Sequence, residues 1–565
     1  MWDGHDCGAA LVVDGVVKLA LNEERLSGRK LDVGFPTRCV QQMRELANDM
    51  PIVWAVSTSD VAKTMTRTFP WMKEDYYKLR RRMVRPGALN GVKLRAKYFL
   101  TQLGTGRLLR SYTRRMFARR LAATIDDVVI VDHHAAHAAS AVFWPQWETD
   151  TLVVTLDGIG DGESGSVWKW THASRKLDKL LSISGSASLG LFFEHVTNEL
   201  QMRPLEDEGK VMALATYAAE IPDTQNVFQK WFDLRVDDRG LPRLTCTVAP
   251  SRMAKAVRDV IWCTPREQVC KMAQQTLEHF VPRFFSMLHG ATGIGSFAYA
   301  GGVASNIKVN RLIRNLPEIR TLRICPAMGD GGLALGAALY AWHTLSGEPP
   351  QPFEDFRLGT PPKDLSEGAE KLAAECNAAC IRPSDIAVAV AELIAKGEIV
   401  MWAQGRMELG ARALGARSII ARADSVSARD DLNLRLKRRV WFQPFCPSIL
   451  HSEARRLLSD YRGASDDNFH MTAGFLASPE GRVALAGAIG HDGSCRPQMV
   501  RDDQSESWAR MLMHVKELTG VGAVINTSLN MHGKPMSDAA AGVIAAWLES
   551  GVKHLALGSA LLSKR

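Results

Sequence analysis

The chain has 565 residues, which is too many for one hydrophobic core and predicts at least two domains. Hydrophobic residues make up 46% and charged residues 23% of the chain, a composition that excludes intrinsic disorder. The 10 cysteines lack a Cys-x-x-Cys pair, which argues against a disulfide framework or a cysteine zinc site. There is no run of about 18 apolar residues and no signal-peptide pattern, so we expect a cytoplasmic protein without a membrane partner.

The first predicted elements are short strands. Residues 9–21 are apolar on both sides of Asp14-Gly15, a pair typical of a tight hairpin turn. Two further apolar runs, Val128–Val131 and Thr151–Leu156, predict two more strands.

Positive charge is concentrated in one block. The net charge is +9, yet the segment from Lys78 to Arg120 alone contains fourteen Lys or Arg and no Asp or Glu. So many charges cannot be buried unpaired, so we expect an exposed insertion at about residues 65–125. The block is either a solvated surface with helical segments or a binding surface for a phosphate-rich partner such as nucleic acid.

The run VDHHAAHAAS favours a helix that places His133 and His137 on one face, one turn apart. Two histidines rarely suffice for a metal, so carboxylates must arrive from elsewhere. Asp157 ends an apolar strand, and Asp330 lies in a glycine-rich turn before a small-residue helix. These four residues predict a metal site, although a surface helix with two histidines is the alternative interpretation.

A second glycine-rich turn indicates a nucleotide. In the segment 297–310 a strand runs into Gly301-Gly302 and then a helix, whose backbone amides could hold an anion. Such a turn is also common in ordinary strand-to-helix packing.

The second half follows a proline-rich linker at 351–365. After the linker we expect a helix over Asp385–Lys396, closed by Gly397, and a strand over Glu398–Trp402. The segment GRMELGARALGARS then interleaves glycines with three arginines, a pattern that surface arginines do not explain and that suits phosphate groups.

These motifs, in this order, resemble the NodU/CmcH-type O-carbamoyltransferases, which include nodulation-factor enzymes and cephamycin- and aminoglycoside-modifying enzymes. The resemblance covers nearly the whole chain and rests on GHDCGAALVVDG (4–15), NEERLSGRK (22–30), DHHAAHAASA (132–141), DGIGDGES (157–164), EDEGKVMALA (206–215), AGGVASN (300–306), GDGGLALGAA (329–338), QGRMELGARALGARSI (404–419), NLRLKRRVWFQPFCPS (433–448) and NTSLNMHGKP (526–535).

The resemblance implies an α/β protein with two domains. Residues 1–350 would form a domain of the actin/Hsp70/sugar-kinase type, similar to TsaD and HypF, and 366–565 a YrdC-like α/β domain. Because the chain begins directly before the Gly4-His5-Asp6 motif, we expect either that the start codon is annotated late or that the central sheet lacks its first strand.

The resemblance also implies a reaction and its partners. The C-terminal domain would make carbamoyl-adenylate from ATP, with magnesium, and carbamoyl phosphate. The N-terminal domain would then transfer the carbamoyl group to a hydroxyl of a small-molecule acceptor beside a divalent metal, iron first, with manganese or zinc as alternatives. Nucleic acid is a less favoured acceptor, and the chain could form a homodimer.

Site residues follow from the same resemblance. The metal ligands would be His133, His137, Asp157 and Asp330, and the catalytic residues His5 as base with Asp207 and Lys210. The nucleotide-binding residues would be Gly301, Gly302, Asn306, Arg412, Arg417, Asn526 and Ser528, and the carbamoyl-phosphate-binding residues Arg406, Lys437, Arg439 and Arg496.

Several positions depart from the family pattern: Ala411, Ala416, Val440, Gln443 and His532. Gln443 stands where an arginine often precedes Pro-Phe, which would weaken or rearrange adenylate formation. Three other classes compete with this interpretation: a sugar-kinase-like ATPase, a nucleic-acid-modifying enzyme and a non-catalytic binding module. A kinase of this superfamily would not need the GRMELGARALGARS segment.

Overall fold

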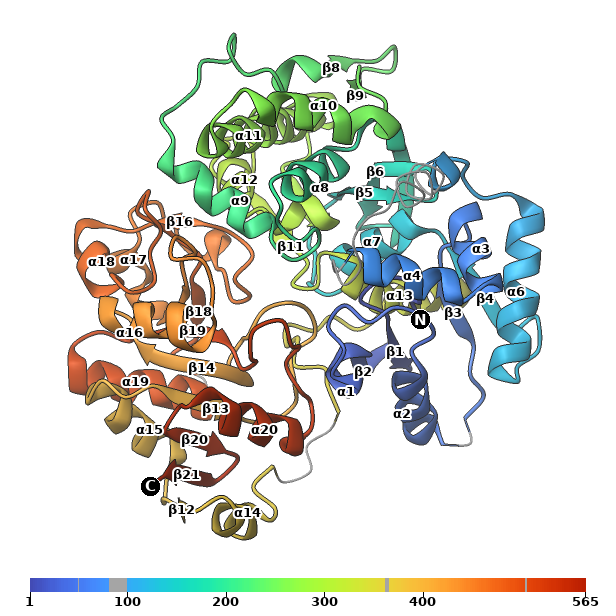
Figure 1. Ribbon diagram of the computed structural model, residues 1–565. Coiled ribbons are helices and arrows are strands. Elements are labelled where there is room, and N and C mark those ends of the chain that lie inside the picture. The colour runs from blue at the N-terminus through green and yellow to red at the C-terminus, as the bar shows by residue number, and fades with distance from the viewer. Residues whose placement is uncertain (49, 81–98, 361–364, 504–505) are drawn as a thin grey trace. The chain divides into compact units, whose positions relative to one another are not determined.

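The computed structural model describes residues 1–48, 50–80, 99–360, 365–503 and 506–565 (Figure 1). The chain forms two compact units, the first made of 1–23 and 31–354 and the second of 24–30 and 355–565. The short segment 24–30 therefore belongs to the second unit, where the Arg25 guanidinium donates to the Gly410 carbonyl at 2.6 Å. Among the described residues, no helix has the length and apolar character needed to cross a membrane.

The first unit is mixed α/β, and its largest sheet has the strand order β11-β10-β5-β6-β7. Strand β10 runs parallel to β11 and β5, whereas β6 runs antiparallel to β5 and β7. The strands are β1 (Gly8–Val13), β2 (Val16–Asn22), β3 (Trp54–Ser57), β4 (Val128–Val131), β5 (Thr151–Gly160), β6 (Glu163–Thr171), β7 (Lys176–Ser184), β8 (Phe232–Val236), β9 (Pro242–Cys246), β10 (Ser296–Ala300) and β11 (Thr321–Ile324). The helices are α2 (Thr37–Ala47), α3 (Val61–Thr68), α4 (Trp71–Arg80), α6 (Arg107–Leu121), α7 (His133–Val142), α8 (Leu189–Glu199), α9 (Glu208–Leu214), α10 (Pro250–Trp262), α11 (Arg266–Thr292), α12 (Ile307–Arg314) and α13 (Leu333–Ser346).

The strands predicted in the first half are confirmed. Strands β1 and β2 pair antiparallel around Asp14-Gly15, and Gly15 has a φ of +75°, a conformation that glycine adopts without steric cost. The predicted strands over 128–131 and 151–156 correspond to β4 and to the start of β5. The apolar residues of β5 are buried because the strand lies between β10 and β6 in the sheet.

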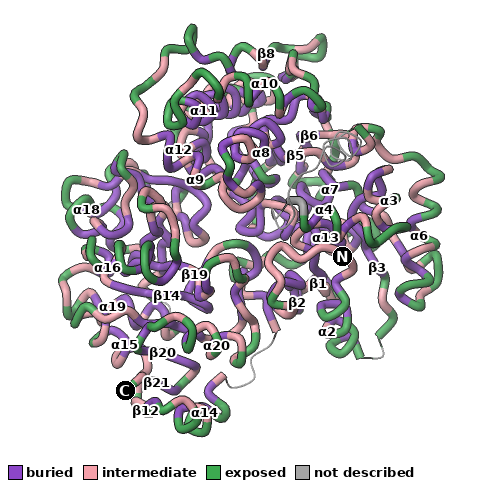
Figure 2. The backbone as a smooth tube through the Cα atoms, viewed as in Figure 1, coloured by how far each residue is buried: buried purple, intermediate pink, exposed green. Residues whose placement is uncertain are grey.

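Helix α7 packs against α13 through small residues. All ten residues of α7 are buried (Figure 2). At the contact, a Cβ added to Gly336 would lie 1.9 Å from the Ala136 carbonyl oxygen, a distance that no real side chain tolerates. The alanine-rich sequence of α7 and the glycine of α13 therefore allow the two helix backbones to approach closely. This contact fixes the helix that carries both predicted histidine ligands.

The basic block lies partly outside the described residues, because 81–98 are not among them. Of the described part, Lys78 and Arg80 lie near the C-terminus of α4, and the other cations lie on α6. Arg107, Arg115 and Arg119 are exposed on α6, while Phe117 is buried. The exposed insertion over the whole block stays a prediction.

The second unit is built on a mixed sheet with the order β12-β21-β20-β13-β14-β19-β15-β18. The predicted helix and strand after the linker are confirmed, with Gly397 at a φ of +87° between them. The strands are β12 (Ala378–Ile381), β13 (Val400–Ala403), β14 (Arg417–Arg422), β15 (Cys446–Leu450), β16 (Phe475–Leu476), β17 (Ser494–Cys495), β18 (Gln498–Val500), β19 (Ala523–Ser528), β20 (His554–Leu557) and β21 (Ala560–Lys564). The helices are α1 (Glu24–Ser27), α14 (Ala369–Glu375), α15 (Ile386–Ala395), α16 (Val426–Asp430), α17 (Ala454–Leu457), α18 (Pro479–Ala484), α19 (Ser507–Thr519) and α20 (Ala540–Ser550).

Two glycine-to-alanine substitutions test the close contact between α7 and α13. Gly336→Ala should lower the free energy of unfolding by about 1–3 kcal/mol, because the new methyl group overpacks the contact. Gly290→Ala is the matched control, since Gly290 lies in α11 with open space around its Cβ position. The control should raise stability by up to about 1 kcal/mol through helix propensity. Urea denaturation measures both, and equal effects would contradict the packing argument.

Candidate metal centre

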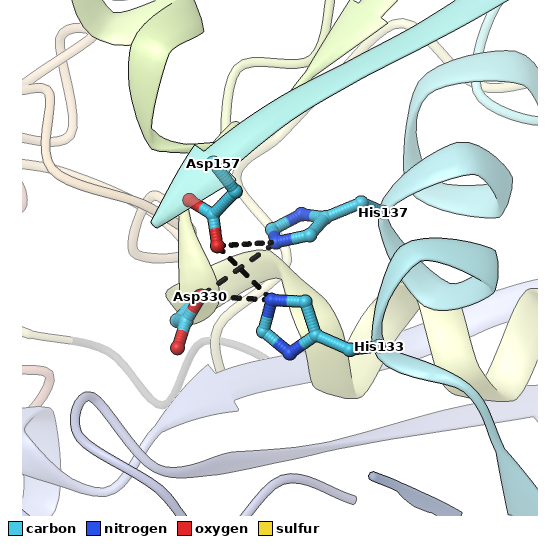
Figure 3. A group of neighbouring side chains, drawn as sticks. All are labelled: His133, His137, Asp157 and Asp330. Carbon is cyan, nitrogen blue, oxygen red and sulfur yellow. Dashed lines mark hydrogen bonds and ion pairs between the residues drawn. The ribbon is translucent and has the colours of Figure 1, made fainter. Parts of the chain in front are cut away.

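Four side chains from three separate segments meet in the first unit (Figure 3). Helix α7 begins at His133, and His137 follows one turn later. Because residues four apart lie on the same face of a helix, both side chains point in the same direction. Asp157 comes from β5, and Asp330 from the 3-10 turn Asp330–Gly332 that leads into α13. The predicted set of four is thus brought together by the fold.

The facing atoms are close enough to share one ion. One ligand atom from each of the four residues lies within 4.8 Å of all the others. The Nε2 atom of His133 is 3.0 Å from Asp157 Oδ2 and 3.7 Å from Asp330 Oδ1. The Nε2 atom of His137 is 3.6 Å from both of these oxygens. Ligands at about 2.0–2.2 Å from a common tetrahedral ion would lie roughly 3.3–3.6 Å apart, so the spacing fits a metal.

The electrostatics of the group also suit a cation. His137 is completely buried, and neither of its ring nitrogens has a hydrogen-bond partner among the described residues. Burial opposes a charge on this ring, but Asp157 and Asp330 outweigh it and raise the pKa of His137 to about 9. Burial likewise opposes the Asp330 carboxylate, yet His5 and His133 lower its pKa to about 2. Two carboxylates thus favour positive charge at His137, in a place where a divalent ion would supply that charge instead.

A second set of groups orients these ligands. The Gly302 amide donates to Asp157 Oδ1 at 2.6 Å, which leaves Oδ2 facing the two histidines. The His133 amide donates to Asp161 Oδ2 at 2.7 Å, and Thr58 Oγ1 lies 3.4 Å from His133 Nδ1. Partners of this kind orient the ligands of metal sites. Sequence reasoning missed Thr58 and Asp161, and only the position of Asp161 in the DGIGDGES motif could have suggested one of them.

His5 lies at the edge of this group. Its Nδ1 atom is 3.4 Å from Asp330 Oδ2, and its side chain is 28% exposed, so it can meet both the metal ligands and an incoming molecule. The Trp2 indole donates to the His5 carbonyl oxygen at 2.8 Å and fixes the turn. No role was predicted for Asn22 from the sequence. Its side-chain amide donates to the Gly331 carbonyl at 3.1 Å and holds the turn that carries Asp330.

The other predicted residues of the first unit make contacts elsewhere. Lys210 Nζ pairs with Asp207 Oδ1 at 2.8 Å, and Asp207 also accepts from the Arg203 amide at 2.9 Å. No contact described for this pair reaches the four metal-ligand candidates. Asn306 caps α12 by accepting from the Val309 amide at 3.2 Å. The roles predicted for these residues in acceptor or nucleotide binding stay predictions.

The Gly301-Gly302 turn is required by packing as well as by any ligand. Gly301 has a φ of +95°, and a Cβ there would lie 2.1 Å from the Leu156 carbonyl oxygen. The turn therefore packs against β5 at Leu156, and the Gly302 amide donates to the adjacent Asp157 carboxylate. Among the described residues, the anion that this turn binds is thus a carboxylate of the protein itself.

In the second unit, several predicted substrate-binding cations bind the backbone of the protein. The Arg417 guanidinium, which is 1% exposed, donates to five carbonyls spread over two loops, those of Gln404, Gly405, Ala416, Ser537 and Asp538. The buried Lys437 ammonium donates to the Ser528 carbonyl and to both oxygens of Asn530, the latter at 2.8 Å. These cations hold loops in place, and direct contact with substrate stays a prediction for them.

Three further predicted residues also have internal partners. Arg406 donates to the Gly359 carbonyl at 2.8 Å and the Leu358 carbonyl at 3.1 Å. The Asn526 amide donates to Ser448 Oγ at 2.9 Å, and Ser528 Oγ donates to Asn530 Oδ1 at 2.6 Å. Of these contacts, the one between Ser528 and Asn530 reaches the loop that begins where β19 ends.

Arg412 and Arg496 differ from the other cations because they come together without a carboxylate. Arg496 donates from Nε and Nη2 to Cys446 Sγ at 3.1 and 2.9 Å. Burial and then the proximity of Arg496 lower the pKa of Arg412 to about 9. No carboxylate of the described residues lies within 4 Å of either guanidinium. Two converging guanidinium groups of this kind are suited to an anion. Arg439 lies nearby in sequence over the Phe445 ring, at 5.9 Å from its centroid.

Two protein-family models match the two halves of the sequence. The family model described as the carbamoyltransferase N-terminus matches residues 3–339, and the carbamoyltransferase C-terminus matches residues 391–564. An uncharacterized protein of Methanocaldococcus jannaschii is 33% identical over 435 residues, covering 72% of this chain and 69% of that protein. Nodulation protein NolNO of Sinorhizobium fredii is 29% identical, and the match covers 99% of this chain and 79% of that protein. Nodulation protein NolO of Bradyrhizobium diazoefficiens is 30% identical, covering 77% and 79%.

Among solved structures, full-length HypF in its phosphate- and nucleotide-bound form is 15% identical, with a TM-score of 0.26, and covers 41% of this chain and 45% of that chain. A TM-score of this size is too low to define the fold, so the classification rests on the family models, which together cover both halves of the sequence. The chain belongs to the carbamoyltransferase family and is a carbamoyltransferase.

Proposed function

We propose that this carbamoyltransferase is an ATP-dependent O-carbamoyltransferase with its two reaction steps in separate units. The observation that carries the proposal is the buried group of His133, His137, Asp157 and Asp330, whose spacing and charge suit a divalent metal. The paired guanidinium groups of the second unit support a separate site for phosphate-bearing substrates.

The first step would take place in the second unit. ATP, carbamoyl phosphate and water would give carbamoyl-adenylate, pyrophosphate and phosphate, with magnesium accompanying ATP. Arg412 and Arg496 carry charge that no carboxylate of the described residues neutralises within 4 Å, so the phosphates of the substrates would be their partners. Lys437 and Arg417 would act by holding the surrounding loops, as their backbone contacts indicate.

The second step would take place at the four-residue group of the first unit. His5 would accept the proton of the acceptor hydroxyl, since its ring is partly exposed and lies beside Asp330. His133, His137, Asp157 and Asp330 would hold the metal, and the Gly302 amide would keep Asp157 in its ligating orientation. A bound divalent metal would supply Lewis acidity at the carbamoyl carbonyl and charge for the departing phosphate.

Two nitrogen and two oxygen ligands suit borderline ions, so we propose iron, with manganese or zinc as alternatives. The acceptor would be a hydroxyl of a small molecule, such as a sugar or a natural product.

Arg412→Ala tests the adenylation site. Because the Arg412 Nε makes no hydrogen bond within the described structure, its removal should leave the fold intact. Loss of one charge-assisted contact of about 2 kcal/mol or more should slow carbamoyl-phosphate-dependent ATP/pyrophosphate exchange at least about 30-fold. Arg435→Ala is the control, since that side chain is 81% exposed. Exchange at the unmodified rate in Arg412→Ala would refute the assignment.

His137→Ala tests the metal centre. The variant should lose metal affinity by more than about 10-fold and lose transfer to the acceptor, because a buried ligand is removed. ATP/pyrophosphate exchange should continue, since the residues proposed for adenylation belong to the other unit. Elemental analysis of the purified protein and the exchange assay measure the two effects. The exposed His172 provides the control variant His172→Ala. A full complement of metal in His137→Ala would exclude His137 as a ligand.

A further inference from the structure

A group of three cations surrounds one buried carboxylate in the first unit. Lys63 and Arg67 come from α3, and Lys73 comes from α4. All three surround the carboxylate of Asp3, which is 2% exposed. Three positive side chains around one carboxylate leave an excess of positive charge, and burying excess charge lowers stability.

Two of these cations satisfy Asp3 completely. Arg67 donates to Oδ1 from Nη2 at 2.7 Å and to Oδ2 from Nε at 2.9 Å, and it also binds the Thr58 carbonyl. Lys73 Nζ donates to Asp3 Oδ2 at 2.9 Å. The charge of Asp3 is therefore already paired, and Lys63 is the additional cation.

The Lys63 ammonium has an unusual environment. It lies 3.9 Å from the centroid of a Trp2 ring, and a Cβ added to Gly4 would be only 2.3 Å from its Nζ. Within the described structure, no carboxylate lies within 4 Å of this ammonium and no hydrogen bond is made by it. The nearby Asp60 carboxylate accepts from the Lys63 backbone amide at 2.6 Å and so caps α3.

Three effects raise the energy of the charge on Lys63. The side chain is half-buried, it is close to two other cations, and it lies in the first turn of α3, where the helix dipole disfavours positive charge. Burial is the largest effect, and Asp3 compensates for it only in part, so the pKa of Lys63 falls to about 8. An anionic ligand would relieve all three effects at once.

Trp2 connects Lys63 to the metal centre. The centroid of the Trp2 ring lies 5.8 Å from that of His133 and 6.4 Å from that of His5, in edge-to-face contacts. Gly4, against which the ammonium lies, immediately precedes His5. The Lys63 ammonium thus contacts the Trp2 ring, and that ring in turn contacts the proposed base and one proposed metal ligand.

We propose that Lys63 forms an anion subsite of the transfer centre and binds the phosphate group of the carbamoyl-adenylate. This inference rests on the proposed function, because the adenylate is the anionic substrate that this centre would receive. As the carbamoyl group leaves for the acceptor, negative charge grows on the AMP phosphate, and a fixed ammonium stabilises it. An anionic group on the acceptor has the same chemistry and is distinguished by experiment.

The test measures ligand binding in the full-length, metal-loaded chain that also carries Arg412→Ala, so that the second unit contributes little phosphate binding. Lys63→Met should weaken AMP binding roughly 10- to 100-fold in calorimetry, as expected for loss of a charge-assisted contact. Lys63→Arg should keep affinity within a few-fold. Lys176→Met, at an exposed position of β7, should leave affinity unchanged.

A stability readout separates a ligand-binding role from a structural one. In the absence of ligand, Lys63→Met should have an unchanged or higher Tm, because a destabilising charge is removed. A lower Tm together with AMP affinity within twofold of the parent would overturn the proposal and make Lys63 a packing residue. Inorganic phosphate serves as a second probe, and weakened phosphate binding with unchanged AMP binding would assign the subsite to an anionic acceptor and overturn the adenylate assignment.

The outcome is distinguishable from failure of the proposed function. Lys63→Met in the chain with Arg412 intact should keep full ATP/pyrophosphate exchange, since Lys63 belongs to the first unit. Absence of exchange in the unmodified protein would refute the two-step function. Equal AMP and phosphate affinities in all Lys63 variants would refute the subsite, whatever the exchange assay shows.

Discussion

The buried carboxylate of Asp157 is the interaction on which the first unit depends. It is 9% exposed and carries its charge within the central strand β5, where an unpaired charge would be strongly destabilising. Each oxygen has its own partner: the Gly302 amide at 2.6 Å holds one, and the His133 ring at 3.0 Å contacts the other. Because β5, α7 and the turn after β10 must meet at this point, satisfying one charge positions three segments of the unit.

The same constraint explains the small residues around the site. A histidine pair can reach Asp157 only if α7 lies close to the sheet and to α13, and Gly336 removes the Cβ that would collide with the Ala136 carbonyl. Gly301 plays the equivalent role beside Leu156 of β5, where its positive φ allows the turn to reach the carboxylate. The glycines at 301 and 336 are therefore required by backbone packing within the protein, whether or not a ligand is bound. The approach of backbones makes the metal-ligand group possible.

In the second unit the positive charges divide into two classes. Arg417 and Lys437 are fully engaged with backbone carbonyls, so they stabilise loops. Arg412 and Arg496 instead meet near Cys446, which leaves their charge for an anion. Residue type alone does not separate these classes, because every arginine offers the same donors. Their separation depends on which carbonyls the folded chain places within reach.

The sequence by itself determined the strands within 9–21, 128–131, 151–156 and 398–402, the helix that carries the histidine pair and the identities of the four metal-ligand candidates. These depend on local patterns: apolar runs, a spacing of four in a helix, and carboxylates in glycine-rich turns. The tertiary structure decided what had no local signal. It assigned residues 24–30 to the second unit, brought Thr58 and Asp161 against His133, and placed Lys63 beside Trp2. These contacts join residues that are far apart in the chain, so no local sequence pattern predicts them. They form because a buried polar or charged group must have a partner in the folded protein.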